Sequence, residues 1–172
     1  MVDFEVVELP ETDHVAEGDV APDFTRPLVA EEYWEDRSLS AFTDEGPVLL
    51  VFGTMDGAFP ATYMWNELRD RELGDHLSVL GVSVSTPYEH KQFIAERGMN
   101  YRLFSDPAAD LAEAYGVTHD LDGMTGVVEH RPAVFILDGD RTVEYAWVAA
   151  EWPDFPDYDE VEAAVERVAG SD

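Results

Sequence analysis

The chain has 172 residues, with 38 Asp or Glu against 10 Lys or Arg, and its formal net charge is −28. No basic cluster is available to neutralise phosphates, which excludes nucleic acid and anionic membranes as partners. Apolar residues make up 45% of the chain, enough for one hydrophobic core, and we expect a single domain over residues 1–172. This acidity indicates a halophilic protein, because concentrated salt screens the self-repulsion of a compact acidic chain.

Two further features of the composition limit the chemistry. The chain contains no cysteine, which excludes disulfides, thiolate metal ligands and thiol redox chemistry. No stretch approaches the roughly 18 apolar residues of a membrane-spanning helix, and the N-terminus is acidic where a signal peptide would be basic. We therefore expect a cytoplasmic protein without a metal or other cofactor.

The first part of the chain predicts an arm followed by a buried strand. Weak alternation of apolar residues over 1–17 predicts an N-terminal strand or arm on the body of the domain. A turn-rich segment at 18–24 leads to a strand, and residues 39–42 predict a short helix. The run 48–52 is apolar at every position, which is typical of a strand buried on both faces of a sheet.

Helices and strands alternate in the rest of the chain. Pro60 stands where the first residue of a helix would, and the apolar spacing continues that helix over 61–73. The other predicted elements are a strand at 77–84, a helix from Pro87 to Gly98, a strand at 101–104, a helix at 107–115, a strand at 133–137 with a hairpin partner at 142–148, and a helix at 158–168. This order predicts a three-layer α/β/α sandwich with a mixed central sheet.

Five stretches carry a resemblance to a known family. They are Ala21-Pro22-Asp23-Phe24; the strand, loop and helix that end in Glu67-Leu68-Arg69-Asp70; residues 79–84 with Pro87 and His90-Lys91; Phe104-Ser105-Asp106-Pro107 with residues 114–117; and residues 131–138. In this order the chain resembles the peroxiredoxin-like family of the AhpC/TSA (redoxin) type over about residues 18–168. The resemblance implies a thioredoxin-like fold, antioxidant oxidoreductase activity, and a homodimer or a related redoxin subunit as partner.

The same resemblance shows what this chain lacks. Family members carry a proline, a threonine and a peroxidatic cysteine at the spacing P-x-x-x-T-x-x-C, and alignment by the helix places Thr54, Ala58 and Ala61 there. The thiolate is the nucleophile that attacks peroxide, and the hydroxyl of Thr62, with no adjacent base, cannot replace it. The helix N-terminus and Arg131, which aligns with the family's second active-site arginine, favour a small ligand or anion near Arg131. Alternatively, Arg131 pairs with a neighbouring carboxylate.

Two interpretations of the function remain open. In the first, the chain is a cysteine-free peroxiredoxin-like protein without thiol peroxidase activity that acts by binding or assembly. In the second, it is a thiol-dependent peroxidase whose cysteine has been exchanged for Ala61 by engineering. The first is favoured, because a single engineered change would not also have replaced the proline and the threonine by Thr54 and Ala58.

Other patterns are weaker. The five histidines and the sequence His119-Asp120-Leu121-Asp122 suggest a metal site, but no pair has the i, i+4 spacing of a helical metal motif. Surface or core histidines are therefore favoured. Tyr63 and Trp65 are expected in core packing and not on a ligand. The aromatic segment 152–158 either caps the domain's own sheet or joins a subunit interface.

Overall fold

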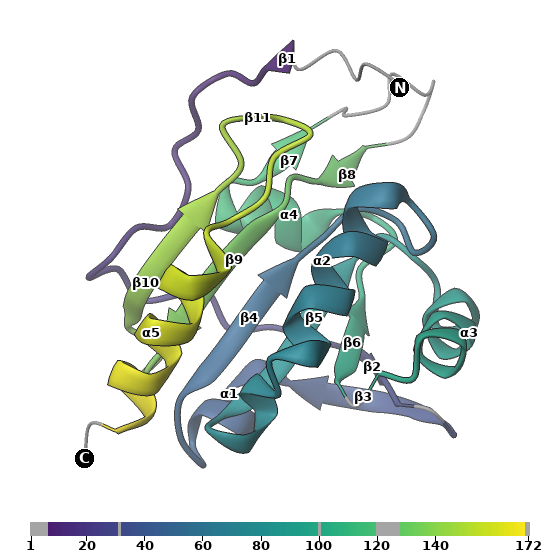
Figure 1. Cartoon of the computed structure of the whole chain (residues 1–172). Helices are drawn as coiled ribbons and strands as arrows, with labels where there is room; N and C mark the ends of the chain where they lie inside the picture. The colour runs from purple at the N-terminus through teal and green to yellow at the C-terminus, as the bar shows by residue number, and fades with distance from the viewer. Residues whose placement is uncertain (1–6, 31, 100, 120–127, 171–172) are drawn as a thin grey trace.

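A seven-stranded mixed sheet forms the centre of the computed structural model, which describes residues 7–30, 32–99, 101–119 and 128–170 (Figure 1). The strand order is β10-β9-β4-β5-β6-β2-β3, and β4, β5 and β6 run parallel while the other neighbours are antiparallel. The strands are β2 (Thr25–Val29), β3 (Trp34–Ser38), β4 (Val48–Phe52), β5 (Ser78–Ser83), β6 (Arg102–Ser105), β9 (Ala133–Leu137) and β10 (Val143–Val148).

Helices cover both faces of this sheet (Figure 1). They are α1 (Leu39–Thr43), α2 (Phe59–Asp70), the 3-10 turn η1 (Leu73–Asp75), α3 (Pro87–Arg97), α4 (Asp110–Tyr115) and α5 (Tyr158–Ala169). One hydrophobic cluster joins α2, α3 and α5 to one face, and a second joins α1 and α4 to the other. The predicted α/β/α sandwich with a mixed sheet is confirmed.

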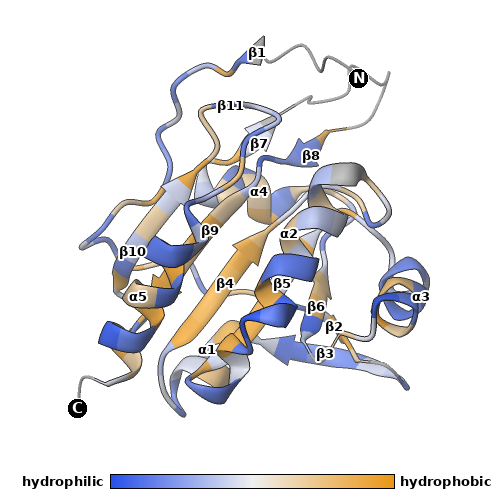
Figure 2. Cartoon of the chain, viewed as in Figure 1, coloured by the Kyte–Doolittle hydropathy of each residue, from blue (hydrophilic) through white to orange (hydrophobic). Residues whose placement is uncertain are grey.

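The central strand β4 explains why its sequence is apolar without alternation. Leu49 and Val51 belong to the cluster under α2 and α5, whereas Leu50 and Phe52 belong to the cluster under α1 and α4. All of its residues are buried, and Figure 2 shows β4 as a hydrophobic band through the middle of the fold. A strand covered on both faces needs apolar residues at every position.

The ends of the helices follow local sequence signals. Thr86 and Glu89 form a reciprocal capping box at the start of α3, and Gly98 ends that helix in the left-handed conformation at φ 59°. Helix α2 begins at Phe59, one residue before Pro60, and ends at Asp70, earlier than the predicted residue 73. The chain leaves the helix there and enters η1.

Two short pairings lie outside the main sheet. Strand β1 (Val7–Glu8) pairs antiparallel with β11 (Glu151–Trp152), so the described part of the N-terminal arm lies against the segment that follows β10. Strand β7 (Thr118–His119) pairs with β8 (Glu129–His130). The other residues of the predicted arm at 1–6 lie outside the described ranges. Among the described residues, no helix has the length and apolar character needed to cross a membrane.

Candidate functional site

The amino end of α2 lies at the sheet edge where the parallel strands β4, β5 and β6 end (Figure 1). Residue Ala58 precedes the helix in an extended conformation and supplies no side-chain cap, and Pro60 lies in the first turn. Ala61 follows with 1% of its surface exposed, so the side chain at the position predicted to align with a peroxidatic cysteine is a buried methyl group. The first turn of α2 also contains no acidic side chain.

Three hydrogen bonds hold the loop between β4 and α2 in place. The backbone N–H of Met55 donates to Glu129 Oε1 at 3.1 Å, and the N–H of Asp56 donates to Ser85 Oγ at 2.8 Å. The carboxylate of Asp56 lies 2.6 Å from His90 Nδ1. Side chains from three other segments of the chain therefore fix the position of this loop.

His90 on α3 is fully buried and uses both ring nitrogens. Its Nε2 lies 3.0 Å from the carbonyl oxygen of Phe104, which can only accept, so Nε2 carries a hydrogen and donates it. One more proton must lie between Nδ1 and the Asp56 carboxylate, since their 2.6 Å contact is a hydrogen bond. This buried pair ties the loop to α3 and, through Phe104, to β6.

A second histidine and aspartate pair lies at the same sheet edge. His130 Nε2 lies 2.8 Å from Asp106 Oδ2, which also accepts the N–H of Leu111 at 2.9 Å. Asp106 Oδ1 is 3.5 Å from Arg26 Nε, an ion pair that compensates the buried carboxylate. His130 Nδ1 is buried and has no hydrogen-bond partner among the described residues. A buried nitrogen without a partner is uncommon in folded proteins.

The threonines of the site have different surroundings. Thr54 is 1% exposed, and its Oγ1 has no hydrogen-bond partner among the described residues. Thr62 is half-buried on α2, and its backbone N–H donates to the carbonyl of Ala58 at 3.0 Å. Over the residues that the structure describes, neither hydroxyl forms a hydrogen bond with a base that could activate it. The site is thus a polar, partly unpaired pocket edge that contains no nucleophile of the kind the family uses.

Arg131 makes its hydrogen bonds away from this loop. Its Nη1 donates to the carbonyl of Pro10 in the N-terminal arm at 2.9 Å and to the carbonyl of Ala149 at 3.2 Å. Burial lowers the pKa of this guanidinium, and its Nε has no partner among the described residues. No carboxylate lies within ion-pair distance of Arg131 in the described part of the chain. A cavity of about 260 Å³ adjoins it, bordered also by His14 and Glu11.

The sequence predicted Thr54, Ala58, Ala61, Thr62 and Arg131 as a degenerate peroxidatic pocket. The structure places Thr54 in the loop just after β4 and Ala58, Ala61 and Thr62 at the beginning of α2. It directs the hydrogen bonds of the Arg131 side chain to the arm and to Ala149. Sequence analysis assigned no role to the polar residues that surround the loop: Asp56, His90, Asp106, Glu129 and His130. A signal for two of them was present, because Asp56 and Asp106 follow the carboxyl ends of parallel strands, where α/β folds place their sites.

The aromatic residues near α2 serve packing. Trp65 is 4% exposed and lies with its ring 5.8 Å from that of Tyr101 in the core. The prediction of core packing is wrong for Tyr63, which is 44% exposed and whose ring lies 4.8 Å from that of Phe155 and 6.5 Å from that of Tyr158. The aromatic segment 152–158 therefore contacts the chain's own α2, which neither of the two predicted alternatives described.

The histidines show no metal site in the part of the chain that the structure covers. No group of three or more His, Asp or Glu in the described ranges could hold a metal ion. His90 and His130 are core residues, each paired with an aspartate. The predicted candidates Asp120 and Asp122 lie outside the described residues.

Comparison with solved structures defines the class of fold. The chain is similar to the peroxidoxin BcpB of Mycobacterium tuberculosis, with a TM-score of 0.75 and 25% identity over 90% of this chain and 99% of that one. It also superimposes on the AhpC of Enterococcus faecalis, with a TM-score of 0.75 and 17% identity over 88% and 90% of the two chains. These likenesses define a thioredoxin-like peroxiredoxin fold.

Sequence comparison assigns the family. The sequence profile of the AhpC/TSA family matches residues 17–146, more than half of the chain, and the protein belongs to this family. It is 29% identical to a thiol peroxidase of Staphylococcus aureus over 158 residues, which covers 90% of each chain. A thiol peroxidase of Staphylococcus saprophyticus is 28% identical over 149 residues, 84% of each chain. The predicted AhpC/TSA membership is confirmed.

Proposed function

We propose that this protein is an AhpC/TSA family member without thiol peroxidase activity that acts by binding or assembly. The observation that carries the proposal is Ala61, whose buried methyl group lies in the first turns of α2 where the family has its thiolate. The chain contains no cysteine at any other position either, so no thiol elsewhere could take over the reaction. Peroxide reduction by this family needs a side chain that forms a bond to oxygen, and a methyl group forms none.

The surroundings of Ala61 support the same proposal. Ala58 offers no hydroxyl to orient a peroxide, and Arg131 donates to the carbonyls of Pro10 and Ala149. Electrostatic stabilisation of a leaving oxygen requires donors that point at it. We include in the proposal a small ligand or anion at the cavity beside Arg131, whose unpartnered Nε is a donor for it.

Peroxide consumption tests the loss of activity. The unmodified protein is expected to consume hydrogen peroxide no faster than a buffer blank with any thiol reductant. Ala61→Cys places a thiol at the N-terminal turn of α2, where helix N–H groups favour the thiolate, and is expected to react with peroxide. Thiol oxidation is followed by mass spectrometry, and peroxide by its loss from solution.

Thr62→Cys is the matched control, since it carries a thiol one residue further along the same helix. It is expected to react more slowly than Ala61→Cys, because it does not stand at the peroxidatic position. Reductant-dependent turnover by the unmodified protein would contradict the proposal. A cysteine codon for residue 61 in the natural gene would favour the alternative, in which the natural protein is a thiol peroxidase like its staphylococcal relatives.

Exposed aromatic residues support the assembly part of the proposal, as a homodimer or with a related redoxin subunit. Tyr33 is 62% exposed and Tyr88 is 74% exposed, and the ring of Tyr88 lies 4.9 Å from that of Trp34 on the edge strand β3. Apolar groups gathered at an open sheet edge are typical of contact surfaces.

Light scattering tests this assembly. We expect a particle heavier than one chain in concentrated salt, and a lighter particle for Tyr88→Ser because the change removes an exposed ring. Val20→Ser is the control, since Val20 is 62% exposed elsewhere on the surface. A single-chain mass for the unmodified protein would contradict assembly with itself. An origin in a halophilic archaeon, inferred from the acidic composition, and a cytoplasmic location, inferred from the lack of a long apolar run, are part of the same proposal.

A further inference from the structure

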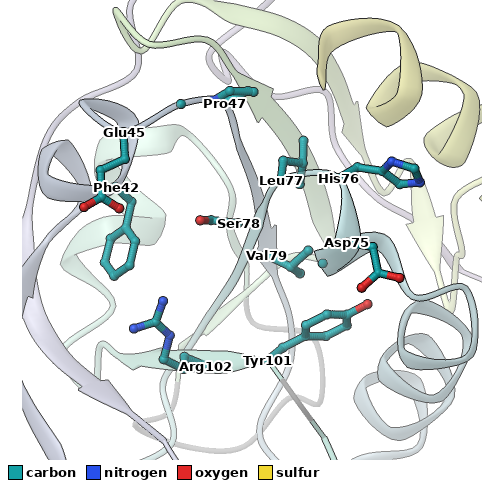
Figure 3. A pocket seen from close by; sticks show the side chains of 12 residues that line it. Phe42, Glu45, Pro47, Asp75, His76, Leu77, Ser78, Val79, Tyr101 and Arg102 are labelled. Atoms are coloured by element: carbon teal, nitrogen blue, oxygen red, sulfur yellow. The ribbon is translucent and has the colours of Figure 1, made fainter. Parts of the chain in front are cut away.

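A second cavity lies at the opposite edge of the sheet from the amino end of α2. Its volume is about 520 Å³, within the range of small-molecule sites. It is bordered by Pro47, Ser78 and Arg102, which stand at or next to the amino ends of the parallel strands β4, β5 and β6. Residues of α1 and η1 form the remaining sides (Figure 3). Neither the family assignment nor the proposed function uses this cavity.

Arg102 is the cationic group of this cavity. Its guanidinium carbon lies 4.7 Å from the centre of the Phe42 ring, and that of Arg37 lies 4.8 Å from the same ring. Burial, followed by the like charge of Arg37, lowers the pKa of Arg102. In the described ranges, the side chain of Arg102 forms no ion pair and no hydrogen bond, whereas Arg37 pairs with Glu35 at 3.4 Å. The charges of Glu45 and Glu35 act on Arg102 in the opposite direction to Arg37 and raise its pKa, but neither carboxylate is within ion-pair distance of it.

The stacking on Phe42 orients Arg102 for a ligand. A guanidinium that stacks through its flat face keeps its N–H groups free at its edge, in the arrangement that binds a carboxylate through two hydrogen bonds. Figure 3 shows the guanidinium of Arg102 pointing into the space beside Phe42 and below Ser78. An anion at this place would give the guanidinium of Arg102 the direct partner that its side chain does not have among the described residues.

Carboxylates stand on other sides of the same cavity. Glu45 and Asp75 both border it, and both are exposed (Figure 3). Tyr101 forms a fixed wall between Asp75 and Arg102, because its hydroxyl donates to the carbonyl of Leu68 at 2.8 Å and accepts the N–H of Leu73 at 3.1 Å. The cavity thus presents a cation on one wall and anions on others.

We propose that this cavity binds a small zwitterion, such as a free amino acid, whose carboxylate pairs with Arg102 and whose cationic nitrogen pairs with Asp75 or Glu45. A ligand with several negative charges would be repelled by both carboxylates and by the net charge of the chain. A purely cationic ligand would leave Arg102 unpaired and would be repelled by it. A molecule with one charge of each sign can pair with Arg102 and with one of the two carboxylates at the same time.

Nuclear magnetic resonance titration with glycine tests the proposal. In salt that keeps the protein folded, glycine is expected to shift the backbone amide signals of Glu45, Ser78 and Arg102 and to saturate. Arg102→Gln is expected to weaken this binding by about tenfold or more, because it removes the charged bidentate donor. The control Lys91→Gln makes the same change of charge on α3, outside the cavity, and is expected to bind glycine like the unmodified protein.

Ligands that carry only one of the two charges test the contributions of Arg102 and of the carboxylates separately. Acetate carries only the carboxylate and methylammonium only the cation, and each is expected to bind more weakly than glycine. Asp75→Asn, at an exposed position that should tolerate the change, is expected to weaken the binding of glycine and to leave the binding of acetate unchanged. Absence of saturable shifts with glycine would overturn the proposal, as would equal binding by Arg102→Gln. Acetate or sulfate that binds as tightly as glycine would also overturn it, by showing a simple anion site.

Discussion

The substitution Asp56→Ala is expected to lower the free energy of unfolding by about 1–3 kcal/mol, the range for leaving a buried hydrogen-bonding group without its partner. The side chain of Asp56 is 7% exposed and that of His90 is 1% exposed, so the remaining histidine would lose its partner without gaining water. The loop before α2 would lose one of its side-chain anchors as well. Urea unfolding followed by circular dichroism measures the change.

Two further variants make this test specific. Asp70→Ala removes a carboxylate that is 68% exposed and pairs with Arg69 on the surface, and it is expected to cost no more than about 1 kcal/mol. The double variant Asp56→Ala with His90→Leu is expected to recover part of the loss, because an apolar pair avoids the buried unpaired ring. Equal losses in the free energy of unfolding for Asp56→Ala and Asp70→Ala would show that the buried pair contributes no more to stability than the surface pair.

Thermal stability is expected to fall steeply as salt is removed. The formal net charge is −28, and its repulsion acts over about 3 Å at 1 M salt but over about 10 Å at 0.1 M. Repulsion among carboxylates is stronger in the folded chain than in the expanded unfolded chain, so weaker screening favours unfolding. We expect the Tm to fall continuously from about 1 M to about 0.1 M potassium chloride, as followed by scanning calorimetry.

A non-ionic solute serves as the control for this effect. Sucrose stabilises folded proteins by exclusion from their surface and does not screen charge. At low salt, sucrose is therefore expected to restore less of the Tm than potassium chloride of equal osmolality. A Tm that stays constant over the whole range of salt would contradict the interpretation of the acidity as an adaptation to salt.

The layers of the fold were predictable because each depends on a local pattern. The apolar run of β4 and the Pro87 to Gly98 boundaries of α3 follow from hydrophobicity and from helix end signals. Strand β3 was not predicted, since its residues Trp34–Ser38 are mostly polar and none of them is fully buried. It lies at the open edge of the sheet, where it pairs with one neighbouring strand only. Because it is little buried, its sequence has no apolar pattern that would predict a strand.

The candidate site was predictable only in part. The helix that begins near Ala58 and Ala61 was predictable, because Pro60 and the apolar spacing after it are local signals, while the assignment of Thr54, Ala58 and Ala61 to a peroxidatic pocket stays a prediction. The pairing of Asp56 with His90 joins residues 34 positions apart and depends on how α3 packs beside the ends of β5 and β6. Sequence periodicity carries no information about such a contact. The hydrogen bonds of Arg131 likewise depend on where the N-terminal arm lies.

The two hydrogen bonds of the Arg131 side chain, to the carbonyls of Pro10 and Ala149, differ in how firmly their acceptors are held. Backbone amides of β4, buried on both faces and paired on both sides, exchange with solvent only when the whole domain unfolds. Among the described residues, the outer part of the arm is held by the two-residue β1–β11 pairing and by the bond from the Leu9 N–H to the carbonyl of Ala150 at 2.9 Å. Such short ladders open locally at lower free energy than a core strand, so we expect openings that remove the Pro10 carbonyl from Arg131 and leave that of Ala149.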